Sequence, residues 1–287
     1  MHTLALRRRI EISISGRNIS GDRIKMKNIM KSIWFEILHS KLLIRIYVAF
    51  VFIMGLIAVL NVNIDTKKTG ASGMITDNAA IIYEFPIFIL ALIVGVICGE
   101  DYKDKVANYE ILSGHSRISI FFARSLMGII PGAVLATILC FIPLIVGILV
   151  GGWGNELVLS DVIIREFLMF FPMLRLAAFF ALLTFMIKNQ YIIMAIGFVV
   201  SMFQTIINEM LSHSKSVYVS IFNMGLLMNF DGWSIYNVDP ASGVVYYNSY
   251  VSSVSMQLVV GTIVVSLLMT AFYLFMGYAL FRRDELS

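Results

Sequence analysis

Six apolar runs of membrane-spanning length dominate the sequence. They cover about residues 42–62, 79–99, 126–150, 167–187, 191–207 and 258–280. A helix needs about 20 apolar residues to cross the hydrocarbon core of a bilayer, whereas a barrel strand needs only about 10 alternating residues. With 59% hydrophobic and 14% charged residues, the chain lacks the composition of a soluble globular protein. We therefore predict an all-α integral membrane protein with six transmembrane helices within residues 41–283, the fifth of them marginal in length.

The distribution of Lys and Arg predicts the orientation of these helices. Basic residues crowd positions 1–45 and return in the loops after the second and fourth runs and after the sixth run. The opposite loops hold only Lys67, Lys68 and Lys215, with Arg165 at the edge of a run. Since cytoplasmic loops carry the excess of basic residues, both termini are predicted to be cytoplasmic. This bias also explains the net charge of +4, and no basic face interleaved with aromatic residues indicates binding of nucleic acid.

The segment before the first run has two parts. Residues 1–27 are basic, lack the apolar core of a signal peptide, and are expected to form a disordered extension. Met26 or Met30 is an alternative start of the protein. Residues 28–40 place their apolar side chains on one side of a helix, which favours an amphipathic helix lying in the membrane interface. A plain cytoplasmic extension of the first span is the alternative.

A charged amphipathic stretch follows the second run. Tyr102, Val106 and Tyr109 recur at helical spacing, so they form one narrow apolar stripe among charged residues. Gly114 suits the end of this helix, and Ser116 is a good N-cap for the helix that follows. We predict a helix over 101–113 that lies in water and docks a soluble partner.

Polar residues within the apolar runs are candidate functional residues, because a charge at the bilayer centre costs at least about 2.5–3.5 kcal/mol. Glu84 can pair with Arg165 or Arg175, since the second and fourth spans run in the same direction. Such a pair either fixes helix packing or lines a substrate path. The complete set of intramembrane polar candidates is Glu84, Arg165, Glu166, Arg175 and Gln204. Gln204 is interpreted as a packing hydrogen bond.

The segment 208–255 between the fifth and sixth runs is predicted to be external. Its apolar part, 217–230, is about 14 residues long and is too short for a seventh span. We expect a short helix there that re-enters the membrane or rests on the outer leaflet. An aromatic-rich loop with turn signals at Asp231-Gly232 and Asp239-Pro240 follows it.

Sequence motifs of catalysis are not found. The two cysteines and four histidines have no metal-ligand spacing, and no phosphate-binding loop occurs. We therefore predict no catalytic residues, bound metal or cofactor on this chain. A membrane-embedded enzyme would need a cluster of reactive groups at one depth, which the sequence does not show.

The order of these elements resembles the type-2 permeases of bacterial ATP-binding-cassette exporters. The specific match is Glu100-Asp-Tyr-Lys-Asp-Lys-Val-Ala-Asn-Tyr-Glu-Ile-Leu-Ser-Gly-His-Ser-Arg117, followed by Ile120-Phe-Phe-Ala-Arg-Ser-Leu126. Ala107-Asn108 stands where the family usually has Gly-Thr, and His115 stands where Pro is common. The resemblance covers about residues 28–283. It implies that the helix docks an ATPase subunit through Asp101, Tyr102, Lys105, Val106, Asn108, Tyr109, Glu110 and Arg117.

The resemblance also implies the partners and the cargo. The ATPase subunit would hold ATP and Mg²⁺, and a second copy of the permease or a homologous permease would complete a pair with 12 spans in total. The pair would lie in the bacterial plasma membrane and export an amphipathic or hydrophobic substrate, for example an antimicrobial peptide. The alternatives are an ion-coupled secondary transporter and a non-transporting anchor or immunity protein.

Overall fold

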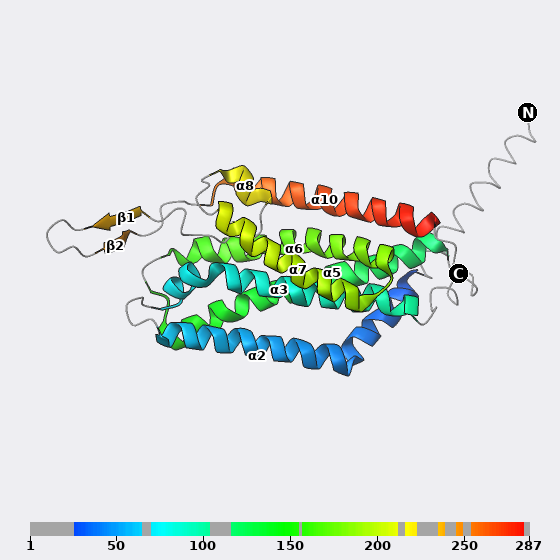
Figure 1. Ribbon diagram of the computed structural model, residues 1–287, viewed down its shortest axis with the longest axis horizontal. Helices are drawn as coiled ribbons and strands as arrows, with labels where there is room; N and C mark the ends of the chain where they lie inside the picture. The colour runs from blue at the N-terminus through cyan, green and yellow to red at the C-terminus, as the bar shows by residue number, and fades with distance from the viewer. Residues whose placement is uncertain are drawn as a thin grey trace, which may run out of the picture.

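A bundle of long helices forms the body of the protein (Figure 1). The computed structural model describes residues 26–64, 70–103, 116–154, 157–211, 216–222, 235–238, 245–248 and 254–283. For 63–64, 76–84, 100–103, 208–209 and the two strands it describes the backbone alone. After a helix at residues 26–39, the elements are α2 (Lys41–Ile64), α3 (Gly70–Lys103), α5 (Arg117–Gly151), α6 (Leu159–Ile187), α7 (Gln190–Leu211), α8 (Val217–Phe222), β1 (Ile235–Val238), β2 (Val245–Asn248) and α10 (Met256–Arg283).

The long helices have the length and composition of membrane spans. Among the described residues, five segments are long and apolar enough to cross a bilayer: Lys41–Val62, Arg117–Gly151, Leu159–Ile187, Gln190–Ile207 and Met256–Arg283. The region predicted as the second span lies within α3, where the apolar segment with described side chains is Phe85–Gly99, because residues 76–84 and 100–103 are described by their backbone alone. The predicted all-α multi-pass membrane protein is confirmed at this level.

The two ends of the bundle differ. One end carries residues 26–39, the end of α3, the start of α5 and the end of α10, and we call it the basic end after Arg117, Lys188, Arg282 and Arg283 (Figure 1). The opposite end carries α8 and the β1–β2 hairpin, and we call it the hairpin end. The hairpin pairs Ile235 with Asn248 in antiparallel register. Its strands were not predicted, since the sequence indicated an irregular aromatic-rich loop.

Helix α3 lies at the centre of the core, packed against α5, α6 and α7. Glycines of the neighbouring helices allow this close approach. A Cβ added at Gly197 of α7 would lie 2.3 Å from the Cβ of Ala91, and one added at Gly128 of α5 would lie 2.6 Å from the sulfur of Cys98. Because lipid provides no hydrophobic force between helices, small residues that permit dense packing stabilise such a bundle.

At the hairpin end, the start of α3 is fixed to the connection between α5 and α6. The backbone N–H groups of Ala71 and Ser72 donate to the carbonyls of Gly152 and Trp153 at 2.9 and 2.8 Å. These bonds satisfy two of the N–H groups that a helix start leaves without an intrahelical partner. Gly70 makes the approach possible, since it adopts a φ of +86° and a Cβ there would lie 2.8 Å from three backbone atoms.

Helix starts lie further from the bundle centre than hydropathy predicted. The apolar part of the third run was placed from residue 126, within a helix predicted to start at Ser116, and α5 begins at Arg117, where the Oγ of Ser116 accepts from the N–H of Ser119 at 3.2 Å. This confirms Ser116 as the N-cap. The fourth run was expected from residue 167, but α6 begins at Leu159. Polar first turns lower the hydropathy of a segment without ending its helix.

Candidate functional site

The predicted docking helix is only partly within the described residues. Lys105, Val106, Asn108, Tyr109 and Glu110 lie outside them. Asp101 and Tyr102 continue α3 without a break after Gly99, and only their backbone is described. Arg117, at the start of α5, donates from Nη1 to the carbonyl of Arg282 at 3.4 Å. It thereby joins the far end of the docking segment to the end of α10.

An aromatic cluster at the basic end connects three helices. Phe121 of α5 is fully buried, and its ring centroid lies 4.9 Å from that of Phe185 in α6 and 5.6 Å from those of Tyr278 and Phe281 in α10. Gly277 gives it room, because a Cβ there would lie 3.3 Å from the Phe121 ring. Since packed interiors resist deformation, a displacement of the start of α5 would be passed to α6 and α10. This cluster was not predicted, although all four aromatics fall near the predicted cytoplasmic ends of spans.

Arg124 is buried one helical turn beyond Phe121. It is 2% exposed, and its backbone carbonyl accepts from the Cys98 thiol of α3 at 3.7 Å. The contact lies beside Gly128, where α3 and α5 approach closely. The parts of α3 and α5 nearest to the predicted docking segment are therefore in close contact.

Arg175, a predicted intramembrane charge, binds the end of α8. Its Nη1 donates to the carbonyl of Ile221 at 3.1 Å, and its Nη2 donates to the carbonyl of Phe222. Both acceptors belong to the last residues of α8, where helix carbonyls lack intrahelical partners and carry partial negative charge. The partners described for Arg175 are thus carbonyls and not the predicted carboxylate. The side chain of Glu84 lies outside the described residues, so its pairing stays a prediction.

Arg165 and Glu166 lie within α6, which begins at Leu159, and both side chains are buried, at 3% and 0% exposure. The sequence predicted them at the outer edge of a span, and their pairing or their place along a substrate path stays a prediction. Cys140 of α5 lies close enough to Glu166 to interact with it electrostatically. The hydroxyl of Tyr47 in α2 donates to the carbonyl of Leu135 in α5 at 3.1 Å. The Tyr47 hydroxyl thus connects α2 to α5.

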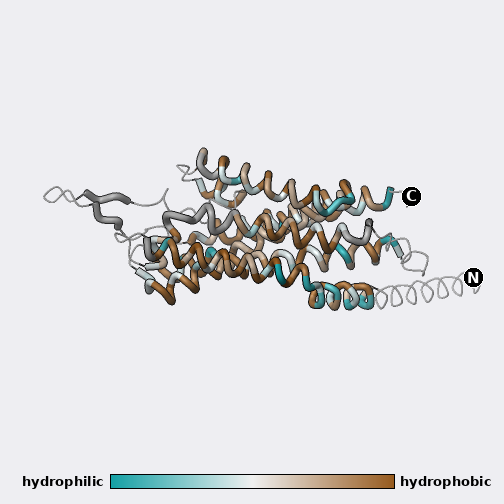
Figure 2. Tube along the Cα trace, turned by 60° about the horizontal axis from the view of Figure 1, so that its bottom comes forward, coloured by the Kyte–Doolittle hydropathy of each residue, from teal (hydrophilic) through white to brown (hydrophobic). Residues whose placement is uncertain are grey.

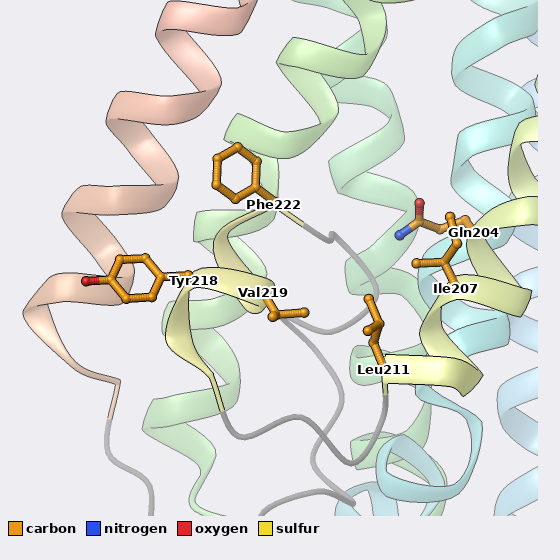
Figure 3. A pocket seen from close by; sticks show the side chains of 6 residues that line it. All are labelled: Gln204, Ile207, Leu211, Tyr218, Val219 and Phe222. Atoms are coloured by element: carbon orange, nitrogen blue, oxygen red, sulfur yellow. The ribbon is translucent and has the colours of Figure 1, made fainter.

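An apolar pocket of about 420 Å³ lies between α7 and α8 at the hairpin end. Its lining comprises Gln204, Ile207, Leu211, Tyr218, Val219 and Phe222 (Figure 3). In Figure 3, Val219 points from α8 toward Leu211 of α7. The position of α8 is fixed by Arg175 at its end and by Tyr218, whose hydroxyl accepts from the amide of Gln257 at 3.2 Å. The pocket can hold an apolar group, with the Gln204 amide as a polar contact.

The described residues contain no group of three or more His, Cys, Asp or Glu side chains suited to a metal ion. No protein-family model matches the chain, and no curated protein matches it. What the fold defines is the class: an all-α multi-pass membrane protein with buried charges in α6.

Proposed function

We propose that the protein is the permease subunit of an ATP-binding-cassette exporter with six spans. In this proposal α3 is the second span, both termini and the basic end face the cytoplasm, and the membrane is the bacterial plasma membrane. The charge bias of the loops supports the orientation. The resemblance of 100–126 to the docking region of type-2 permeases supports the partner, a separate ATPase subunit that binds ATP and Mg²⁺.

One observation carries the proposal. The segment 104–116 connects the end of α3 to the start of α5, and these two helices pack tightly where they meet it, at Cys98, Arg124 and Gly128. A protein bound to that segment would therefore move two core helices together. The Phe121 cluster would extend the movement to α6 and α10. Rigid-body movement of packed helices is an established means of switching access.

The hairpin end would receive the substrate on release. The pocket between α7 and α8 is apolar and lies beside the buried Arg175, which suits an amphipathic or hydrophobic substrate. A second permease copy, or a homologous permease, would complete the transport path.

The decisive experiment measures how much of an ATPase subunit stays bound to the chain and to its variants. The chain is purified from its native membranes, the co-purifying ATP-binding-cassette subunit is identified, and the pair is reconstituted in liposomes. Tyr109→Ala and Asn108→Arg should each weaken retention of the ATPase at least about tenfold, because truncation of an interface anchor commonly costs 2 kcal/mol or more. Asn28→Arg introduces the same charge on the exposed side of residues 26–39 and should leave retention unchanged. Equal retention in all variants would refute docking through 101–113.

An ion-coupled transporter is the second candidate, favoured by the buried Arg165, Glu166 and Arg175 of α6. It predicts uptake or export driven by an imposed ion gradient in liposomes without ATP. The exporter proposal predicts no transport driven by an ion gradient without ATP. The two proposals are thus separated by one set of proteoliposomes with and without the ATPase subunit.

A further inference from the structure

A groove of about 520 Å³ lies at the basic end, between residues 26–39 and the end of α3. Its apolar lining consists of Ile33, Phe35, Ile37, Leu43, Val96 and Ile97, and its polar lining consists of Ser32, Glu36, His39 and Ser40. One side of the groove is thus suited to a hydrocarbon chain and the other to a polar head. No part of this groove belongs to the proposed docking segment or to the pocket beside Arg175.

The helix that forms the groove has the properties of an interfacial element. Ile29 and Ile33 are buried against the bundle, whereas Trp34 and Leu38 on its other side are exposed. Figure 1 shows this helix set at an angle to α2, and Figure 2 shows polar and apolar residues alternating along it. Because α2 is a candidate span that starts directly after the helix break at Ser40, we place residues 26–39 at the level where lipid headgroups meet the hydrocarbon region.

The polar side of the groove consists mainly of hydrogen-bond acceptors. Glu36 contributes a carboxylate, and Ser32 and Ser40 contribute hydroxyl oxygens. The His39 ring is held in place, because Nδ1 bonds to the Phe35 carbonyl at 2.8 Å and the ring stacks on Phe35 with 3.9 Å between centroids. Neither Lys nor Arg is among the described lining residues. This lining suits a small cation that carries several N–H donors.

Three basic residues lie near the lining residues in the sequence but are not part of the lining. Lys31 precedes the lining residue Ser32, and Lys41 and Arg45 lie at the start of α2; all three are exposed. They would attract a phosphate at the rim of the groove while the carboxylate attracts an ammonium group inside it. The charge pattern therefore matches a zwitterionic headgroup whose amine is primary.

We propose that this groove binds a phospholipid with a primary-ammonium headgroup, such as phosphatidylethanolamine. The ammonium group lies at Glu36 and the two hydroxyls, the phosphate lies toward Lys31 and Lys41, and an acyl chain lies along Ile37, Val96 and Ile97. A headgroup that is only anionic would bring no partner for the carboxylate. A choline headgroup has the positive charge but no N–H donor.

The experiment compares lipids with identical acyl chains. The full-length protein is delipidated in detergent and offered phosphatidylethanolamine, phosphatidylcholine and phosphatidylglycerol in equal amounts, and bound lipid is counted by native mass spectrometry. Phosphatidylethanolamine should be retained at least about tenfold over each of the others, because a hydrogen bond to a charged group is worth about 1.5–3 kcal/mol and about 1.4 kcal/mol is a tenfold change in binding. Equal retention of the three lipids, or preference for phosphatidylglycerol, would overturn the proposal.

Two variants locate the site. Glu36→Gln should reduce the preference to less than about twofold, because the amide keeps the shape but loses the charge. Asp161→Asn removes the same charge at the hairpin end and should keep the full preference. Ser32→Trp fills the groove from an exposed position and should lower the retention of phosphatidylethanolamine to that of the other lipids. An unchanged preference in either Glu36→Gln or Ser32→Trp would place the lipid elsewhere and refute the site.

Discussion

At the hairpin end, a glycine without a side chain determines how closely two backbone segments approach each other. Gly70 has a φ of +86°, a conformation that residues with a Cβ adopt at a cost of about 1–3 kcal/mol. The carbonyls of Gly152 and Trp153 then reach the start of α3. The sequence marks 69–73 only as a small-residue stretch after a predicted span. Its role depends on a contact with residues about 80 positions later, which no local pattern encodes.

The first prediction concerns this contact. Gly70→Ala should lower the free energy of unfolding by at least about 3 kcal/mol, because the positive φ and the overlap with three backbone atoms at 2.8 Å both oppose it. Gly152→Ala also has a positive φ, +71°, but no atom within 4 Å of the added Cβ. It should therefore destabilise the protein less. Thermal unfolding in detergent measures both, and equal losses would show that overlap is not the cause.

A second residue-scale prediction concerns Arg175. Arg175→Gln removes the bonds to the Ile221 and Phe222 carbonyls, so α8 should detach more often from α6. Each lost bond to a charged donor is worth about 1.5–3 kcal/mol. In a Ser220→Cys background, where the native serine is buried, labelling by a thiol reagent should become at least about tenfold faster. Arg283→Gln in the same background is the control, and equal acceleration in both would contradict the role of Arg175.

At the scale of helices, the sequence predicted which segments are helical. It did not predict where α6 begins or which side chains are buried near its start. Periodicity and hydropathy identified the six apolar runs and the Ser116 cap, since these depend on neighbouring residues. The extended start of α6 buries Arg165 and Glu166, which depends on tertiary packing that hydropathy does not contain. The same holds for the candidate site, where the sequence predicted a residue but not its partners. Arg175 was recognised as costly in lipid, but its carbonyl partners are about 46 residues away in an element whose position the sequence does not give.

The packing of α3 against α7 provides the element-scale prediction. Gly197→Val should lower stability by about 1–3 kcal/mol, the usual cost of overpacking, because its Cβ would lie 2.3 Å from that of Ala91. Ala195→Val adds a similar volume on the exposed side of α7 and should change stability by less than about 0.5 kcal/mol. Thermal unfolding in one detergent compares the pair. A small effect at both positions would mean that α7 is not held against α3 as described.

At the scale of the whole molecule, the proposed transmission of ATPase movement to the helices depends on the contacts between α5, α6 and α10 at the basic end. Phe121→Leu should leave ATPase docking intact but reduce substrate transport per ATP hydrolysed at least about threefold, since the Phe185 and Phe281 contacts that carry movement to α6 and α10 are weakened. Phe272→Leu removes an exposed aromatic from α10 and serves as the control. Transport and hydrolysis are measured in the same liposomes. Unchanged coupling in Phe121→Leu would mean that movement does not pass through the aromatic cluster.

The six-span arrangement depends on α3, whose apolar segment with described side chains, Phe85–Gly99, is by itself too short to count as a span. If α3 crosses the membrane, a cysteine at position 67, between α2 and α3, and one at position 118, at the start of α5, lie on opposite sides. The charge bias places the second in the cytoplasm. In intact cells, an impermeant maleimide should therefore label Lys67→Cys. It should label Ile118→Cys only after permeabilisation. The native Cys98 and Cys140 are buried and give little background. Labelling of both from outside would show that α3 does not cross, and labelling of Ile118→Cys alone would invert the orientation. Either result would remove the cytoplasmic docking surface on which the exporter proposal rests.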